Sequence, residues 1–256
     1  MSFDAFELLP WRPGWKYEYW DHVAHITPRH TTVTVRVCTF PFPGSPGRRV
    51  RQVVRDDESR LVEVYIAAFE DTIDHCDCDT PELAHSALSN VRGFFDGKRG
   101  IPLPASRVEL DENGAVIGAA LLVDENEQPP LLDMLFVAPQ YQRAGVATSM
   151  VAAASCALYE AGQRLLDSRF MLGNEASDAW HRRFGFQELP DLPLARLRYR
   201  AKQHELWCLE RRQPFEPEAL DALEHEVERL RRHVDDLNAK AEAEGWEAVH
   251  PILHRR

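Results

Sequence analysis

One stretch in the middle of the chain constrains the fold more than any other. It begins with the apolar run Leu131–Val137, interrupted only by Asp133, and such a run is typical of a strand buried on both faces. Pro139 ends the strand, because a proline cannot donate to a sheet ladder. A helix rich in small residues is then expected over Thr148–Ala161, with Gly162 as its stop. The stretch therefore predicts a strand, a tight turn and a helix in direct succession.

The turn between this strand and this helix has the composition of an anion-binding loop. Gly145 lets the backbone approach a ligand closely, and Ala147 keeps the next contact small. The first N–H groups of a helix have no partner within it, and the helix dipole places positive potential there. Thr148 and Ser149 could add hydroxyl donors, and Arg143 a positive charge. The residues predict a pyrophosphate site, the alternative being an ordinary buried turn.

The loop sequence Gln142–Ala147 has the pattern Q-x-x-G-x-A and directly follows V-A-P-Q-Y. It contains neither the G-x-x-x-x-G-K nor the G-x-G-x-x-G nucleotide pattern. It resembles the acyl-CoA-binding motif of the GNAT superfamily of N-acetyltransferases, Q/R-x-x-G-x-G/A. The resemblance implies that loop amides hold the CoA pyrophosphate and that the preceding strand offers backbone groups to the pantetheine arm. The implied CoA-binding residues are Leu135, Phe136, Val137, Gln142, Arg143, Ala144, Gly145, Val146, Ala147 and Thr148.

A second segment, Asn174–Phe186, follows an expected strand over Arg164–Leu172. It resembles the later part of the same family, in which an Asn ends a strand, a short helix follows and Tyr-x-x-x-Gly-Phe closes it. Asn174 falls on the family Asn, which commonly contacts the CoA arm. His181 replaces the tyrosine often credited with protonating the departing thiolate, and a histidine can do so because its ordinary pKa is near neutrality. The alternative is a histidine that contacts CoA or lies on the helix surface.

The composition limits the class of protein. The 256 residues suffice for a full core and an appendage, and 44% hydrophobic with 28% charged residues is ordinary for a soluble protein. Without an apolar run of membrane-spanning length or a signal peptide, and with five scattered cysteines, we expect a cytoplasmic protein without membrane contact. The net charge of −11 disfavours nucleic acid as a partner and is compatible with cationic acceptors.

The first half of the chain shows signals for strands and helices. Residues 1–50 are aromatic-dense, and the alternation in Thr31–Phe40 predicts a half-buried strand, either as an aromatic substrate wall or as a small hairpin packed on the main domain. Arg51–Val54 resembles a first core strand. Amphipathic helices are expected from about Arg60 to Glu70 and from Thr80, which we expect to be the N-cap.

The connection between these helices, Asp71–Asp79, holds four aspartates, two thiols and one imidazole. A solvated acidic loop is the simplest interpretation. Its carboxylates could also attract an amine acceptor, because an acidic rim raises the local concentration of cations. A metal site at His75, Cys76 and Cys78 is less favoured, because Cys-x-Cys is tighter than the usual zinc spacing.

The remaining signals set the fold class. Asn113-Gly114 between two apolar runs predicts a hairpin of Ser106–Leu110 with Ala115–Val123, and Leu131–Val137 adds a third antiparallel strand. Leu197–Arg200 and Glu205–Glu210 read as closing strands. The hairpins favour an α/β fold of the α+β kind with a mixed sheet over a doubly wound one. This order matches the layout of the GNAT-like acyltransferase fold.

A long helix is expected from Pro217 to about Glu244, with a heptad seam of apolar residues. The seam either pairs with the same helix of another chain, giving a homodimer, or lies on its own domain. The predicted division is a β extension over residues 1–50, a GNAT acetyltransferase domain over 51–213, and a heptad helix with its tail over 214–256.

The predicted chemistry is direct acetyl transfer from acetyl-CoA to a primary amine of a small molecule or peptide. Asp133 is the candidate base, since a carboxylate in an apolar strand is costly and the family often carries an acid there. It could instead point to solvent or pair with a basic neighbour, and Asp167 is the second candidate. A backbone N–H near Phe136 or Val137 would stabilise the oxyanion. The alternative function is an acetyl-CoA-binding regulatory or assembly module with little turnover.

Overall fold

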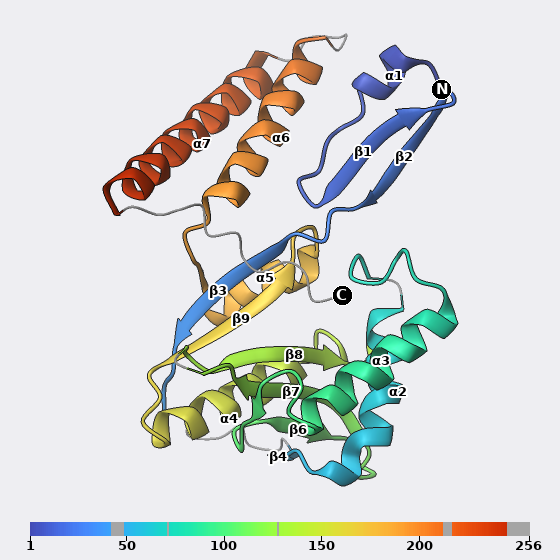
Figure 1. Cartoon of the computed structure of the whole chain (residues 1–256), viewed down its shortest axis with the longest axis vertical. Helices are drawn as coiled ribbons and strands as arrows, with labels where there is room; N and C mark the ends of the chain where they lie inside the picture. Colours follow the sequence, from blue (N-terminus) through green and yellow to red (C-terminus); the bar gives the residue numbers. More distant parts are fainter. Residues whose placement is uncertain (42–48, 71, 127, 212–216, 245–256) are drawn as a thin grey trace. The chain divides into compact units, whose positions relative to one another are not determined.

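The computed structural model describes residues 1–41, 49–70, 72–126, 128–211 and 217–244. These residues belong to two compact units, Thr32–Leu189 and Met1–Thr31 with Pro190–Arg256 (Figure 1). The predicted boundaries at residues 50 and 213 therefore do not coincide with the boundaries of the compact units. In the described part of the chain, no helix combines the length and apolar character needed to cross a membrane.

The unit Thr32–Leu189 is built on one mixed sheet. Its strands follow the order β10-β3-β9-β8-β7-β6-β4, with β5 beside β7. Among the described residues, its strand pairs are antiparallel except β8 with β9, which is parallel. The predicted mixed sheet is thus confirmed. The strands are β3 Thr32–Cys38, β4 Arg49–Gln52, β5 Ile101–Pro102, β6 Arg107–Leu110, β7 Val116–Asp124, β8 Leu131–Val137, β9 Leu165–Met171 and β10 Gln187–Glu188.

Helices cover both faces of this sheet. α2 (Glu58–Phe69) and α3 (Thr80–Phe95) share one hydrophobic core with Ala119, Leu121 and Val123 of β7. Alternation along the strand puts Gly118 on the other face, where it lies against Met150 of α4 (Val146–Glu160). Because β7 is covered on both faces, nearly all of its residues are buried. A further helix, α5 (Glu175–Phe184), follows β9.

The hairpin of β6 and β7 forms as predicted, through a turn over Asp111–Ala115. Gly114 takes a left-handed conformation with φ +84°. The carboxylate of Asp111 accepts hydrogen bonds from the N–H groups of Asn113 and Ala115, both at 2.9 Å. Asp111 therefore fixes the turn together with the Asn-Gly pair.

Two local predictions need correction. The strand expected over Thr31–Phe40 exists as β3, but it pairs along its full length with β9 in the main sheet and is not part of a separate hairpin. Its Val33 and Val35 are buried, which explains why it joins the core. Asp79, not Thr80, is the N-cap of α3: its carboxylate accepts from the N–H of Glu82, whose carboxylate accepts from the N–H of Asp79.

The second unit contains α1 (Phe3–Glu7), a hairpin of β1 (Trp15–Trp20) and β2 (Val23–Pro28), α6 (Leu192–Glu210) and α7 (Pro217–Glu244). The closing strands expected at 197–200 and 205–210 are wrong, because both segments lie within α6. Asp191 caps this helix by accepting from the N–H of Leu194 at 2.9 Å. A short apolar run does not by itself distinguish a strand from a helix.

The heptad seam of α7 packs on its own chain. Val234 and Leu237 form a buried cluster with Ala195 of α6, and Leu192 and Tyr199 pack against it. Of the two alternatives for the seam, this contact corresponds to packing within the chain.

Candidate functional site

The loop between β8 and α4 lies on the surface. A short 3-10 turn over Pro139–Tyr141 follows the strand, and residues 142–145 are exposed. Two residues in the loop have left-handed conformations, Arg143 with φ +60° and Gly145 with φ +82°. Glycine tolerates this conformation without strain, and Gly145 is the residue from which α4 starts. The predicted succession of strand, turn and helix is therefore present.

The start of α4 offers N–H groups without a side-chain cap. Gly145 is the N-cap residue and has no side chain to accept from them. The N–H groups of Val146, Ala147 and Thr148 point out of the first turn and have no acceptor within the helix. Together with the helix dipole they form a region of positive potential suited to a phosphate. The Thr148 hydroxyl is held by the indole N–H of Trp180 at 3.2 Å.

The strands β8 and β9 separate beyond their first paired residues. Each strand has seven residues, but in the described structure the ladder between them joins only Leu131 to Asp167 and Leu132 to Ser168. The rest of β8 keeps its pairs with β7 on the other side. A gap therefore opens between β8 and β9 toward the loop at residues 142–145, and we call it the β8–β9 gap.

Backbone groups of β8 point into this gap. The N–H of Ala138 donates to the Ile117 carbonyl at 2.9 Å, on the β7 side. Since successive residues of a strand alternate, Phe136 also faces β7, whereas Leu135 and Val137 face the gap. The Val137 carbonyl accepts from the side-chain amide of Gln142 at 3.1 Å. Of the predicted backbone donors, Val137 is thus at the gap and Phe136 belongs to the β7 ladder.

Asp133 lies at an irregularity in β8. The register against β7 shifts between Leu121 and Leu122, and Asp133 is left without a partner residue on β7. Its carboxylate accepts two hydrogen bonds from the Arg99 guanidinium, at 2.6 and 2.8 Å, and its side chain is 9% exposed. For Asp133, pairing with a basic neighbour is the arrangement predicted as the alternative to a role as general base, and the contact with Arg99 is such a pair. Asp167, the second candidate, is likewise paired with Arg36 at 2.6 and 2.8 Å.

Asn174 stands at the end of β9 and caps α5. Its side-chain oxygen accepts from the N–H of Ser177 at 3.0 Å, and its side-chain amide donates to Asp74 at 2.7 Å. Asp74 belongs to the acidic loop between α2 and α3. The predicted CoA-contacting residue thus joins this loop to the wall of the β8–β9 gap formed by β9.

His181 is a core residue. It is 3% exposed, so the helix-surface interpretation is wrong. Its Nδ1 lies 2.8 Å from the Ser177 carbonyl, which can only accept, and its Nε2 lies 2.9 Å from the Ser168 hydroxyl. Burial lowers the pKa of His181 to about 4, although the hydrogen bond to Ser177 raises it. The ring is therefore neutral at pH 7 with its proton on Nδ1, which does not favour the predicted acid role.

Sequence reasoning missed a chain of polar side chains between α2, α3 and β8. The Tyr65 hydroxyl lies 3.0 Å from Nε2 of His75 and accepts from the Asn90 amide at 3.1 Å. The Asn90 oxygen accepts from Arg99 at 2.9 Å, and Arg99 holds Asp133. In the sequence, Tyr65 fits the apolar face of an amphipathic helix, and no local pattern marks the other members.

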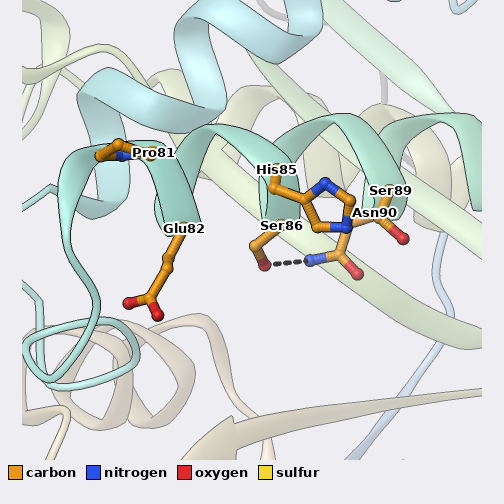
Figure 2. A pocket seen from close by; sticks show the side chains of 6 residues that line it. All are labelled: Pro81, Glu82, His85, Ser86, Ser89 and Asn90. Atoms are coloured by element: carbon orange, nitrogen blue, oxygen red, sulfur yellow. Dashed lines mark hydrogen bonds between the residues drawn. The ribbon is translucent and has the colours of Figure 1, made fainter.

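A hollow of about 510 Å³ lies on the polar face of α3. Figure 2 shows its lining side chains on one side of the helix, with Ser86 hydrogen-bonded to Asn90 at 3.2 Å. Asn90 thus belongs both to the hollow and to the polar chain that leads to β8. The lining residues are Pro81, Glu82, His85, Ser86, Ser89 and Asn90.

The acidic loop over 72–79 is rich in potential metal ligands. Within the described residues, no three His, Cys, Asp or Glu side chains gather in a way that could hold a metal ion. Burial, followed by the nearby carboxylate of Asp77, raises the pKa of both Cys76 and Cys78.

Part of the chain matches a known protein family. Residues 107–188 match the model of the acetyltransferase (GNAT) domain family. No curated protein matches the chain.

Solved structures of acetyltransferases are similar at low identity. A GCN5-related N-acetyltransferase from Sphaerobacter thermophilus has 14% identity and a TM-score of 0.46 over 62% of this chain and 48% of its own. The PaiA N-acetyltransferase from Thermoplasma acidophilum, in complex with coenzyme A, has 14% identity and a TM-score of 0.43 over 55% and 90%. The aminoglycoside 6'-N-acetyltransferase AAC(6')-IG from Acinetobacter haemolyticus has 18% identity and a TM-score of 0.42 over 56% and 93%.

The chain thus spans about half the length of the Sphaerobacter protein. The matched residues, 107–188, contain β6 to β9, the loop at residues 142–145, α4 and α5. The part of the chain that carries the candidate site therefore matches the acetyltransferase (GNAT) domain family.

Proposed function

We propose that this protein is an N-acetyltransferase that moves an acetyl group from acetyl-CoA to a primary amine of a small molecule or peptide. One observation carries the proposal: the uncapped start of α4 stands at the open end of the β8–β9 gap. A diphosphate at the helix start would meet N–H groups that have no acceptor within the helix, and an extended arm in the gap would meet backbone groups of β8 that do not pair with β7. The GNAT match of the same segment supports the same ligand.

Acetyl-CoA would be held by residues at the start of α4 and by residues that line the β8–β9 gap. The N–H groups at the start of α4 would bind the pyrophosphate, and the Leu135 and Val137 backbone groups would bind the pantetheine arm. Gly145 leaves the loop without a side chain at the closest approach. The Val137 N–H would stabilise negative charge on the thioester oxygen during attack by the amine, since a fixed donor is worth more where water is excluded.

A second function is favoured by two observations. Both oxygens of Asp133 are engaged by Arg99, and His181 is neutral and buried. Two groups predicted to move protons are therefore occupied otherwise. An acetyl-CoA-binding regulatory or assembly module with little turnover would have no need of them.

Two measurements separate these functions. Isothermal titration with CoA tests binding, and thiol release from acetyl-CoA tests turnover with spermidine, kanamycin A and a lysine-containing peptide. Amine-dependent thiol release with a matching acetylated product supports the transferase. CoA binding without thiol release for any amine supports the binding module, and absence of CoA binding contradicts both.

We also propose a cytoplasmic location and a homodimer that forms through the C-terminal helix α7. All five cysteines lie in the described residues and none forms a disulfide, which suits a reducing compartment. Val234 and Leu237 of the seam pack on α6, so such a dimer would use the remaining surface of α7. Sedimentation of the full chain at several concentrations measures its oligomeric state.

A further inference from the structure

The side chain of Thr148 belongs to the start of α4, where the diphosphate of CoA would bind under the proposed function. Thr148 is the third residue of the helix and is exposed. The helix start lacks a side-chain cap, so its first N–H groups can donate to an anion. A hydroxyl at this position adds a donor to these N–H groups, provided that its proton is not already given to a protein acceptor.

The hydrogen bond between Trp180 and Thr148 determines how this hydroxyl can donate. The indole Nε1 of Trp180 lies 3.2 Å from the Thr148 oxygen, and an indole N–H can only donate. The Thr148 oxygen is therefore the acceptor, and its own proton is not used in this contact. Among the residues that the structure describes, Trp180 is the only hydrogen-bond partner of the Thr148 side chain. The hydroxyl can thus donate its proton to a ligand at the start of α4.

The bond from the indole also makes the Thr148 hydroxyl a better donor. Hydrogen bonds in a chain polarise one another, so a hydroxyl that accepts one bond donates the next one more strongly. A hydrogen bond to an ionised phosphate oxygen is in addition stronger than one between neutral groups. The chain from indole N–H to hydroxyl to phosphate oxygen would therefore favour an anion over a neutral group at this position.

Aromatic neighbours fix the indole ring of Trp180. The ring stacks on Phe184 with ring centroids 5.2 Å apart and 30° between the planes, and it meets His181 nearly edge-on at 4.9 Å. The ring of Phe186 lies 6.1 Å away. His181 and Phe186 are buried, so the cluster ties Trp180 to the core. The N–H that reaches Thr148 therefore comes from a ring whose position is set by packing.

A second hydroxyl near the helix start also points to an anion there. Ser149 follows Thr148, is 6% exposed, and its Oγ has no hydrogen-bond partner among the described residues. Buried hydroxyls are nearly always hydrogen-bonded, so an unsatisfied one calls for an acceptor. The Cα–Cβ bonds of a helix tilt toward its N-terminus, so the Ser149 side chain projects toward the start of α4. This observation is independent of the bond between Trp180 and Thr148.

We propose that Trp180 is a positioning residue for the cofactor, because it holds the Thr148 hydroxyl so that this group donates its proton to the diphosphate of CoA. The inference rests on the proposed function, since it needs CoA to bind at the start of α4. Trp180 acts on the cofactor through Thr148, so its effect on affinity depends on the presence of that hydroxyl.

The test is a double-mutant cycle on CoA affinity, measured by calorimetry with the unaltered chain, Trp180→Phe, Thr148→Val and the double variant. Phenylalanine keeps an aromatic ring without the N–H, and valine keeps the shape of threonine without the hydroxyl. The controls are Thr148→Ser, which keeps the hydroxyl, and Trp207→Phe, which changes a half-buried tryptophan of α6. Melting temperatures check folding, and Trp180→Met, which also lacks the N–H, takes the place of Trp180→Phe should that variant not fold.

We expect Trp180→Phe to weaken CoA binding roughly tenfold and Thr148→Val roughly tenfold to 100-fold, the range for hydrogen bonds to charged groups. The double variant should bind CoA as Thr148→Val does, because Trp180 then has no hydroxyl to position. Thr148→Ser and Trp207→Phe should bind CoA nearly as well as the unaltered chain. A purely structural role of Trp180 would instead lower the affinity by the same factor with and without the hydroxyl.

The inference and the proposed function fail on different results. If the unaltered chain binds CoA and either Trp180→Phe or Thr148→Val binds it equally well, the inference is wrong while the proposed function stands. Losses that multiply in the double variant would mean that Trp180 acts by another route, which also overturns the inference. If the unaltered chain does not bind CoA, the proposed function fails and the inference with it.

Discussion

Replacing His181 with glutamine should remove a large part of the acid sensitivity of the unit Thr32–Leu189. The pKa of His181 is about 4 in the folded protein, against an ordinary 6.5. The unfolded chain therefore binds a proton more readily than the folded chain between these values. The free energy of unfolding falls as the pH falls from 6.5 toward 4, and this contribution is absent above pH 7.

The magnitude follows from the two pKa values. Between pH 7 and pH 4.5, linkage predicts a loss of roughly 2.5 kcal/mol from this one ring. The side chain is 3% exposed, so solvent screening reduces the figure little. Glutamine does not titrate, so any loss of packing in the variant lowers its free energy of unfolding equally at both pH values.

The assay is urea unfolding followed by circular dichroism at pH 7 and pH 4.5, for the unaltered chain and for His181→Gln. Carboxylates also titrate in this range, but they do so in both proteins. Subtracting the change in the free energy of unfolding of His181→Gln between the two pH values from that of the unaltered chain therefore isolates the contribution of His181. His225→Gln, which changes an exposed histidine of α7, is the control. Equal pH-dependent losses in the unaltered chain and in His181→Gln would refute the reasoning.

Three further substitutions test the packing. Asp57→Asn should lower the free energy of unfolding by about 1–3 kcal/mol in urea, because the buried carboxylate accepts two hydrogen bonds from Arg51, at 2.6 and 2.8 Å. Leu237→Ala should cost about 2–5 kcal/mol and leave the sedimentation coefficient unchanged, because this side chain packs within its own chain. Gly118→Ala should lower the free energy of unfolding by about 1–3 kcal/mol, and with it the melting temperature, because its Cβ would lie 2.9 Å from the Phe136 carbonyl oxygen. An unaffected stability in any of the three would contradict the corresponding contact.

The central strands and the loop could be predicted because their signals are local. The structure agrees with three of these signals: the apolar run of β8, the proline after it, and Gly145 at the start of α4. The hairpin before β8 was predictable for the same reason, since Asn113-Gly114 sits between two apolar runs.

Other features depend on contacts between distant residues. The run in Glu205–Glu210 looks like a strand until the capping Asp191 and the partner helix α7 are known. β3 joins the main sheet because β9 offers it an edge, which no local pattern states. The engagement of Asp133 by Arg99 joins residues 34 positions apart.

His181 and Tyr65 show the same limit at the site. The motif predicts a catalytic role for His181, but only the packing of α5 on β9 shows that its ring is buried against Ser168. Tyr65 fits the apolar stripe of α2, and its hydroxyl gains a role only when α3 brings Asn90 beside it.

The most direct test of the cofactor site is a CoA titration of three proteins by calorimetry: the unaltered chain, Gly145→Glu and Gly162→Glu. The two glycines have similar left-handed conformations, with φ +82° and +83°, at opposite ends of α4. The backbone strain is therefore matched, and only Gly145→Glu puts a carboxylate at the helix start. We expect the unaltered chain and Gly162→Glu to bind CoA and Gly145→Glu to bind at least 100-fold more weakly (about 2.7 kcal/mol or more). Equal affinities of the two variants, or no binding by the unaltered chain, would contradict the account.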